Sequence, residues 1–351
     1  MGTITNHSLR ETAGRIFEYM TKDHAGDWGL DFDHWDWVPG VGVIAIRDYY
    51  ESTGRSDAMR FLVRWAEKNR GKAGGRRVIN AMAPFAVFPA LHRHTSDVLY
   101  RDLALAAGEW LLREAPRTRE GALEHTVTEA VQFAEQVWAD TVFMAVLPLS
   151  ELAKSYGNRA FAEEALRQLL LHYRLLRDEA SAVLFHGWNC AAGNHMSAAR
   201  WTRANAWIAL ATPMILDNVR DLIPIPAEAL DSFRRLIDGL LAFALPSGLW
   251  ATVLDRSDFY PETSGSAGIA AGILRGVRSG WLEPSMRAHA GKTIAAVTAA
   301  VDDRGEVRGV SGGTPVLDSV EAYNAIPQYP TLYGQGLALM LISEALRGER
   351  E

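Results

Sequence analysis

Apolar residues along this chain recur mostly at intervals of three and four, which is the spacing of amphipathic helices. Leu9, Ile16 and Met20 lie on the face of a first predicted helix, and two more helices are predicted over residues 41–50 and 58–69. Alternating apolar and polar residues, which are typical of half-buried strands, are nearly absent. The pattern therefore predicts an all-α protein.

Glycines mark several breaks between the predicted helices. Gly54 and Gly280 stand at such breaks, and Gly157 separates helices predicted over residues 141–156 and 161–177. Roughly a dozen helical segments in 351 residues leave about 29 residues for each helix and its loop, an ordinary length for paired helices. The run over residues 249–254 could be a short strand or an extended loop.

Paired helices can form an open solenoid or a closed barrel. An open solenoid usually shows clear sequence repeats and polar end caps, whereas similarity among the segments here is confined to the turns. The long loops are rich in Trp, His, Asp and Gly, so we expect a closed α/α barrel whose loops form a site on one face. No linker divides the chain, and residues 1–351 are expected to form one catalytic domain.

Composition narrows the possible partners. The net charge of −6 argues against nucleic acid and anionic membranes, but a local Arg or His can still hold a small anion. Cys190 is the sole cysteine, so no intrachain disulfide can form. No apolar run is long enough to cross a bilayer, and the N-terminus lacks a secretory signal pattern. These features predict a cytoplasmic protein; the oligomeric state stays open.

Asp140 stands among apolar residues at the start of a predicted helix, in the segment over residues 134–144. A carboxylate that loses hydration in such surroundings has a raised pKa and can donate a proton near neutral pH. The alternative is a helix N-cap, which accepts backbone N–H groups and has a lowered pKa. This segment alone favours the cap, and the motifs further along the chain favour the proton donor.

Four other stretches also combine aromatic with polar residues at the starts of helices or in loops. Arg203 and Trp207 are four residues apart, so in a helix both can face one cavity. Each stretch alone could be ordinary core or a helix cap, and their recurrence is what favours a shared site. With the Asp140 segment, these stretches cover residues 34–41, 80–84, 185–189 and 201–207.

Other chemistries are poorly supported. His92 and His94 form a bare pair without a metal-binding motif, so no metal or other cofactor is expected. Ser264 does not follow a strand as a nucleophile elbow requires, and the glycines of residues 71–75 lack P-loop spacing.

Taken together, these stretches resemble the unsaturated glucuronyl and rhamnogalacturonyl hydrolases, glycoside hydrolase families 88 and 105. The likeness extends from about residue 10 to residue 347. It is carried by Trp35-x-Trp37-x-x-Gly40, Asn80 with Pro84, Trp138-Ala139-Asp140-Thr141, His186-Gly187-Trp188, Trp201-x-Arg203-x-x-x-Trp207, Gly248-Leu249-Trp250 and Glu262-Thr263-Ser264.

The resemblance implies an (α/α)6 barrel that removes a 4,5-unsaturated uronic acid from the non-reducing end of oligosaccharides produced by polysaccharide lyases. It implies that Asp140 is the general acid/base, with Arg203 or His186 holding the uronate carboxylate. The further residues expected to bind substrate are Trp37, Asn80, Trp138, Trp201 and Trp207.

One departure from the family pattern is Asn80, where many relatives carry an aspartate. An amide can orient a hydroxyl or a water but cannot take a proton, so a base role is not expected there. Three alternatives remain open: a uronidase acting on saturated glucuronides, a sugar epimerase using two histidines, and a non-catalytic helical sugar-binding module. The last predicts an exposed, capping Asp140 and no cavity that joins it to Arg203.

Overall fold

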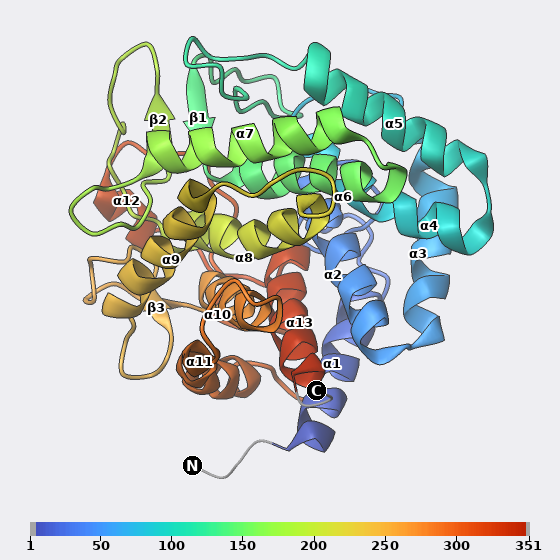
Figure 1. Ribbon diagram of the computed structural model, residues 1–351. Coiled ribbons are helices and arrows are strands. Elements are labelled where there is room, and N and C mark those ends of the chain that lie inside the picture. The colour runs from blue at the N-terminus through green and yellow to red at the C-terminus, as the bar shows by residue number, and fades with distance from the viewer. Residues whose placement is uncertain (1–4, 349–351) are drawn as a thin grey trace.

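The computed structural model describes residues 5–348. Helices dominate it, as the periodicity predicts, and six of them form an inner ring (Figure 1). Two of the six begin with a tighter or wider helical turn, η2 (Asn80–Val87) and η3 (Val142–Val146). The inner helices are α2 (Trp37–Thr53), α4 (Phe88–Thr95) after η2, α6 (Leu147–Tyr156) after η3, α8 (Thr202–Val219), α10 (Thr263–Arg278) and α13 (Leu332–Arg347).

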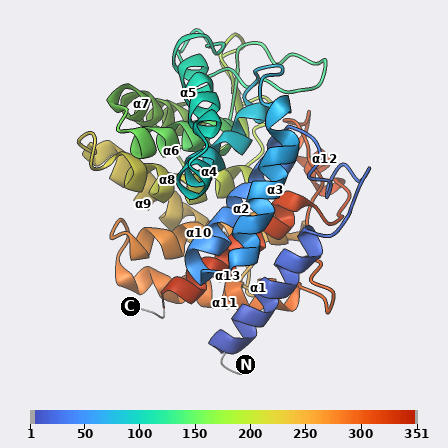
Figure 2. The ribbon, with the colours of Figure 1, turned by 90° about the vertical axis from the view of Figure 1, so that its right-hand side faces the viewer.

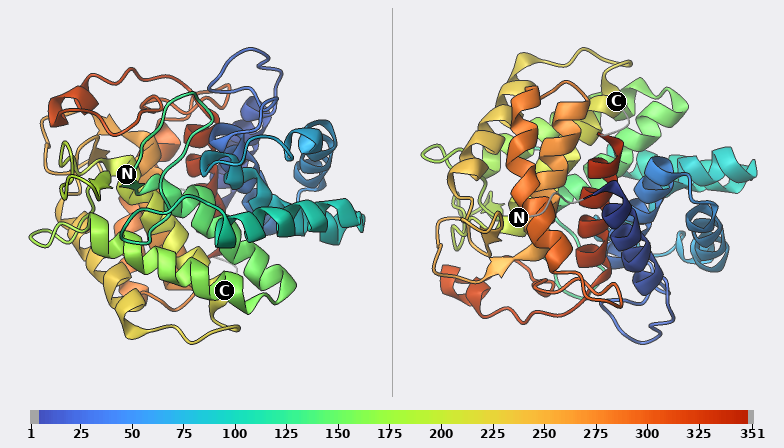
Figure 3. Two further views of the ribbon diagram at one scale, coloured as in Figure 1. Left: turned by 90° about the horizontal axis from the view of Figure 1, so that it is seen from above. Right: turned by 90° about the horizontal axis from the view of Figure 1, so that it is seen from below.

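The inner ring is closed. Contacts run from α2 to η2, from η2 to α6, and then through α8, α10 and α13 back to α2. Six helices pack outside it; Figure 2 shows α3 beside α2, and the right view of Figure 3 shows α11 beside α10 and α1 beside α13. This arrangement confirms the (α/α)6 barrel. The outer helices are α1 (Asn6–Met20), α3 (Ser56–Asn69), α5 (Val98–Arg113), α7 (Arg159–Leu176), α9 (Ala227–Ala242) and α11 (Arg287–Ala299).

The predicted breaks are confirmed where glycines end helices. Gly54 and Gly157 cap α2 and α6 with left-handed backbone, at φ values of 73° and 64°. The strand or loop expected over residues 249–254 contains the two-residue strand β3 (Trp250–Ala251), paired with β4 (Pro261–Glu262). The described part of the chain has no helix that is both long and apolar enough to cross a membrane.

Short elements complete the loop face of the barrel. β1 (Gln136–Trp138) pairs antiparallel with β2 (Gly187–Asn189), and α12 (Val320–Asn324) lies in the loop before α13. The remaining helical turns are η1 (Arg70–Lys72) and η4 (Pro284–Met286).

Small residues allow the inner helices to touch. A Cβ atom added at Gly272 of α10 would lie 2.3 Å from the carbonyl oxygen of Ala209 in α8, and one at Gly268 would lie 2.9 Å from the Cβ of Ala206. Real Cβ atoms do not approach this closely, so these glycines set the distance between α8 and α10. The closeness of the two helices therefore depends on residues with little or no side chain.

We expect Gly272→Ala to lower the free energy of unfolding by roughly 1–3 kcal/mol, because the added methyl group forces α10 away from α8. Gly291→Ala is the matched control: Gly291 lies in α11 with nothing within 4 Å of an added Cβ. That change should leave stability unchanged or raise it by up to about 1 kcal/mol. Denaturant unfolding measures both, and equal stabilities of the two variants would contradict the tight α8–α10 contact.

Candidate active site

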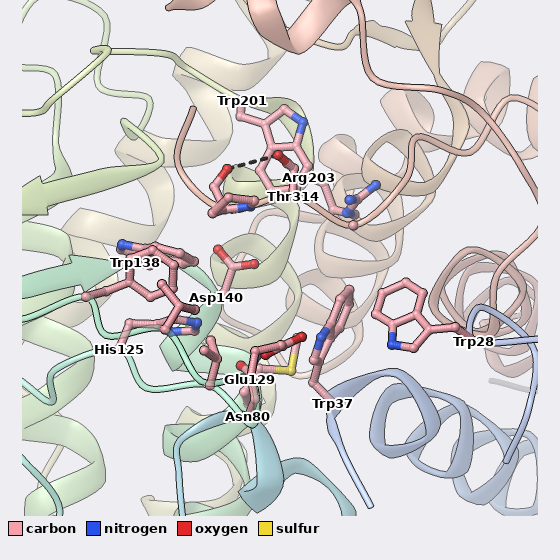
Figure 4. A pocket seen from close by; sticks show the side chains of 16 residues that line it. Trp28, Trp37, Asn80, His125, Glu129, Trp138, Asp140, Trp201, Arg203 and Thr314 are labelled. Carbon is pink, nitrogen blue, oxygen red and sulfur yellow. Dashed lines mark hydrogen bonds between the residues drawn. The ribbon is translucent and has the colours of Figure 1, made fainter. Parts of the chain in front are cut away.

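A cavity of about 280 Å³ opens where the inner helices begin. The N-terminal ends of α2, η2, η3 and α8 contribute to it, together with the loops before β1 and α13. Figure 4 shows Asp140 between the Trp138 wall and the Trp37 wall. The cavity is lined by Trp28, Trp37, Asn80, His125, Val127, Glu129, Val131, Phe133, Trp138, Asp140, Met144, Trp201, Arg203, Gly313, Thr314 and Pro315.

Asp140 lies between β1 and η3, and its side chain is 14% exposed. No backbone N–H of the following helix donates to this carboxylate, so Asp140 is not a cap. The β1–β2 pairing places His186, which precedes β2, beside it: the amide of Ala139 donates to the carbonyl of His186 at 3.1 Å. His186 Nε2 then lies 3.2 Å from Asp140 Oδ2.

The pKa of Asp140 corrects one expectation from the sequence. Burial raises this pKa, as predicted, but the groups around the carboxylate, His186 foremost, together outweigh burial, so the pKa lies below its usual value. Neither His186 Nε2 nor Asp140 Oδ2 has a hydrogen-bond partner of good geometry, so their contact is an electrostatic one. In the free protein Asp140 is therefore ionised at neutral pH.

Tyr323 of α12 holds His186 from the other side. Its hydroxyl lies 2.7 Å from His186 Nδ1 and accepts the amide N–H of Leu317 at 3.1 Å. Burial raises the pKa of Tyr323, so its hydroxyl keeps its proton and can donate it to Nδ1. That arrangement leaves the ring proton of a neutral His186 on Nε2, facing Asp140.

Aromatic rings form the walls around Asp140. On one side the ring of Trp138 stacks on that of His125, with centroids 4.2 Å apart and planes 15° apart. Burial lowers the pKa of His125 to about 4, so this histidine is neutral at pH 7. On the other side Trp37 stacks on Tyr333 at 4.9 Å. Such walls suit a flat, polar ring such as a sugar.

The sequence profile described as Glycosyl Hydrolase Family 88 matches residues 12–348. The chain belongs to this family. It is 34% identical over 324 residues to unsaturated rhamnogalacturonyl hydrolase YesR of Bacillus subtilis (strain 168), with 92% of each chain covered.

Crystal structures of similar proteins agree with the family assignment and the fold. A possible member of family GH105 from Salmonella enterica serovar Paratyphi A is 29% identical, with a TM-score of 0.93 covering 99% of this chain and 96% of that one. The unsaturated glucuronyl hydrolase of Bacillus sp. GL1 is 18% identical, with a TM-score of 0.76 over 98% of this chain and 97% of that one, a likeness of fold alone.

This family 88 chain brings most of the predicted site residues to the cavity. Asp140 and five of the residues expected to bind substrate line it: Trp37, Asn80, Trp138, Trp201 and Arg203. His186 and Trp207 do not. His186 lies behind Asp140 with 1% of its surface exposed, and Trp207 is fully buried against Phe143, with ring centroids 4.9 Å apart. The spacing of four residues does place Arg203 and Trp207 on one face of α8. Only the Arg203 end of that face reaches the cavity, and the Trp207 end packs in the core.

Arg203 is one of the two residues expected to hold the uronate carboxylate, but both of its terminal nitrogens already donate within the protein. Its two terminal nitrogens donate to the carbonyl oxygens of Ser311 and Gly312 at 2.8 and 2.7 Å, and Glu262 lies 3.8 Å away. Its Nε is buried without a partner, and the side chain is 1% exposed. Arg203 therefore holds the loop over residues 311–315, which forms part of the cavity wall, and keeps only Nε and the second N–H of Nη2 for a ligand.

Asn80 begins η2, and its backbone amide donates to the carbonyl of Thr126 at 3.2 Å. Its side chain lines the cavity and makes no capping bond, so the alternative of an ordinary helix cap is wrong. A free amide at this position can donate to and accept from a hydroxyl group.

Four residues of the site lie outside the motifs that the sequence analysis singled out: three line the cavity and one stands behind it. Trp28, His125 and Glu129 lie in loops without a recognisable motif, and Tyr323 stands 137 residues from the histidine that it contacts. The high content of Trp and His in loops was the available hint for the first two. Within residues 5–348 no group of three or more His, Cys, Asp or Glu side chains is placed to hold a metal ion.

We expect Tyr323→Phe to lower kcat about tenfold, since one hydrogen bond of the buried His186 is lost while the ring shape is kept. Loss of this bond also frees the tautomer of His186, so the pH profile of kcat should shift, which loss of packing alone would not produce. Kinetics across pH measure the effect. Tyr329→Phe, at a residue 39% exposed and outside the cavity lining, is the control. An unchanged profile would remove Tyr323 from this role.

Proposed function

We propose that this protein hydrolyses the bond between a 4,5-unsaturated uronic acid and the next sugar at the non-reducing end of an oligosaccharide, with Asp140 as general acid/base. The observation that carries the proposal is the carboxylate of Asp140, which lies beside His186 and lines a cavity walled by aromatic rings. The name of the Bacillus subtilis relative, an unsaturated rhamnogalacturonyl hydrolase, supports the same substrate class.

The reaction fits one carboxyl group. The C4=C5 bond of the substrate is conjugated to the ring oxygen, so protonation at C4 produces an oxocarbenium ion at C5. Water adds at C5 and loses a proton to the carboxylate, which regenerates the acid. The resulting hemiketal opens with loss of the second sugar. No second carboxylate is required on the opposite face of C1, in contrast to ordinary glycosidases.

The pKa of Asp140 is lowered in the free protein, so its carboxyl group must gain a proton before it can act as an acid. A bound substrate carboxylate adds a second negative charge and displaces water from the cavity, and both effects raise the pKa of Asp140. His186, with Nε2 3.2 Å from Asp140 Oδ2, keeps the carboxyl group in position while it takes up a proton from solvent. Asp140 is then the acid of the complex although it is ionised in the free protein.

Several donors can receive the substrate carboxylate. The inner helices α2 and α8 begin at the cavity, and the N-terminal ends of helices carry partial positive charge. The Nε of Arg203 and the indole nitrogen of Trp201, both on lining residues, are buried without partners. We therefore place the uronate carboxylate on this side of Asp140.

Two of the alternatives are disfavoured by the geometry. An epimerase needs two histidines that reach the substrate; His125 lines the cavity, but His186 stands behind Asp140 with both ring nitrogens directed at other residues. A non-catalytic module predicted a capping Asp140 separated from Arg203, and both line one cavity. The third alternative, a uronidase acting on saturated glucuronides, is distinguished from the proposed function by comparing saturated with unsaturated substrates.

The test supplies the protein with a panel of unsaturated disaccharides produced by polysaccharide lyases. It measures the ultraviolet absorbance of their enol ether over time. We expect the absorbance to fall with time and the free second sugar to appear in equal amount. Saturated glucuronides of the same second sugars are the control. Hydrolysis of the saturated compounds alone would overturn the proposal in favour of a uronidase.

A further inference from the structure

Glu129 is a carboxylate of the cavity that the proposed reaction does not use. It lies in the loop between α5 and β1 and lines the cavity, on the Asn80 side in Figure 4, with Trp201 and Thr314 on the opposite side. Unlike Asp140, it is exposed. Trp28 and Val131, which also line the cavity, are 44% and 46% exposed, so these three residues form the mouth.

The carboxylate of Glu129 has no firm partner. No Lys, Arg or His within the described residues forms an ion pair with it. The hydroxyl of Thr128 lies 3.5 Å from Glu129 Oε2 but only 2.8 Å from Asp36 Oδ2, and its single proton goes to the nearer oxygen. Glu129 therefore presents an unpaired negative charge to whatever enters the cavity.

The loop that carries this charge is held in place. Arg76 donates to the carbonyl oxygens of Thr128 and Glu129 at 3.3 and 3.2 Å, and the Thr128 hydroxyl binds Asp36, the N-cap of α2. These bonds leave the Glu129 side chain free while they fix the backbone beneath it. The position of the charge at the mouth is thus built into the fold.

Charges elsewhere in the cavity do not cancel it. The other ionised residues of the lining are Asp140, also negative, and Arg203, whose terminal nitrogens donate to backbone carbonyls and which lies 3.8 Å from Glu262. His125, with a pKa lowered to about 4 by burial, is neutral. Among the lining residues, a ligand group near the mouth therefore meets negative charge without a facing cation.

Substrate orientation decides which sugar meets Glu129. The ring that is protonated must lie over Asp140, which is only 14% exposed, so the next sugar extends toward the exposed mouth. There it meets the ring of Trp28 and the carboxylate of Glu129. An unpaired carboxylate accepts hydrogen bonds from neighbouring sugar hydroxyls and repels sulfate or carboxylate groups.

We propose that Glu129 is a specificity-determining residue: it binds a neutral sugar next to the unsaturated uronyl residue and excludes a sugar that carries sulfate or carboxylate there. This inference rests on the proposed function and names the substrate class within it.

The experiment compares kcat/KM for two unsaturated disaccharides that differ in the second sugar, one neutral and one sulfated. We expect wild type to prefer the neutral compound, Glu129→Gln to lower that preference about tenfold, and Glu129→Lys to lower it further while raising activity on the sulfated compound. The preference of wild type should also shrink as salt is raised, because the mouth is exposed and its field is screened. Glu120→Gln, an exposed carboxylate of the same loop outside the cavity lining, is the control and should behave as wild type.

The outcomes are distinct. An unchanged preference in both Glu129 variants, with activity retained on the neutral compound, would overturn the role of Glu129 and leave the proposed function standing. Failure of wild type to cleave either disaccharide would overturn the proposed function, and the role of Glu129 with it.

Discussion

Asp140→Asn is expected to lower kcat on an unsaturated disaccharide by about 100- to 10,000-fold, the range typical for loss of a general acid. The amide keeps the shape of the side chain but cannot donate a proton to C4 or accept one from water. Binding depends on the aromatic walls and on buried donors, so KM should change by less than about threefold. Decay of the enol-ether absorbance under saturating substrate measures kcat.

The control for this variant is Asp303→Asn, at an exposed aspartate outside the cavity, which should retain full activity. Circular dichroism of both variants separates chemistry from folding. If Asp140→Asn kept more than about a tenth of wild-type kcat, the proton would have to come from another group, and the assignment of the acid would be wrong.

Asp48→Asn should lower the free energy of unfolding by roughly 3–5 kcal/mol, the cost typical of breaking a buried ion pair by removing one partner. Asp48 of α2 is 1% exposed, and its Oδ1 accepts hydrogen bonds from Arg275 of α10 at 3.2 Å and from Arg347 of α13 at 3.0 Å. The cluster thus ties three inner helices together at the end of the barrel opposite the cavity. Removing the carboxylate leaves two largely buried cations whose nearest remaining partner is Glu344, with Glu51 4.0 Å from Arg347.

The same cluster predicts a pH dependence of stability. Burial would raise the pKa of Asp48, but Arg347 and Arg275 outweigh burial and lower it to about 2. A depressed carboxyl pKa contributes stability that is present above the unfolded value of about 4 and is lost as pH falls toward 2. Wild type should therefore lose stability between pH 4 and 2, and Asp48→Asn should lose less over that interval.

Asp102→Asn is the matched control for Asp48→Asn, because Asp102 forms an exposed pair with Arg101, its side chain being 59% exposed. Such pairs contribute about 0–1 kcal/mol. Denaturant unfolding at pH 7 measures both variants. Equal stabilities of the two would show that the cluster gives no more stability than a surface pair.

Local patterns were enough to predict much of this molecule. The spacing of Leu9, Ile16 and Met20 predicted the first helix, and Gly54 and Gly157 predicted helix ends, because helical periodicity and left-handed backbone are properties of short segments. The recurrence of aromatic and polar residues at helix starts predicted a shared site, since the loops at one end of a closed barrel meet on one face.

The state of Asp140 could not be predicted in this way. Its apolar neighbours in sequence indicate burial, which raises a carboxyl pKa, and this part was correct. The opposing effect comes from His186, which the β1–β2 pairing brings to within 3.2 Å from 46 positions along the chain. A pKa depends on charges that are nearby in space. The direction of the pKa shift at Asp140 therefore followed from the strand pairing and not from its neighbours in sequence.

The sequence by itself determined the helices and several of their ends and pointed to Asp140 as the central carboxylate, because each depends on residue spacing or on a motif that spans a few residues. The closed barrel was predicted from the composition of the loops and from the family resemblance. Tertiary structure alone decided what each side chain can still bind. Arg203 is occupied by carbonyl oxygens 108 and 109 positions away, Trp207 is in the core, and Glu129 is free at the mouth. Availability for a ligand depends on which partners the fold brings into contact, and those partners lie far away in the chain.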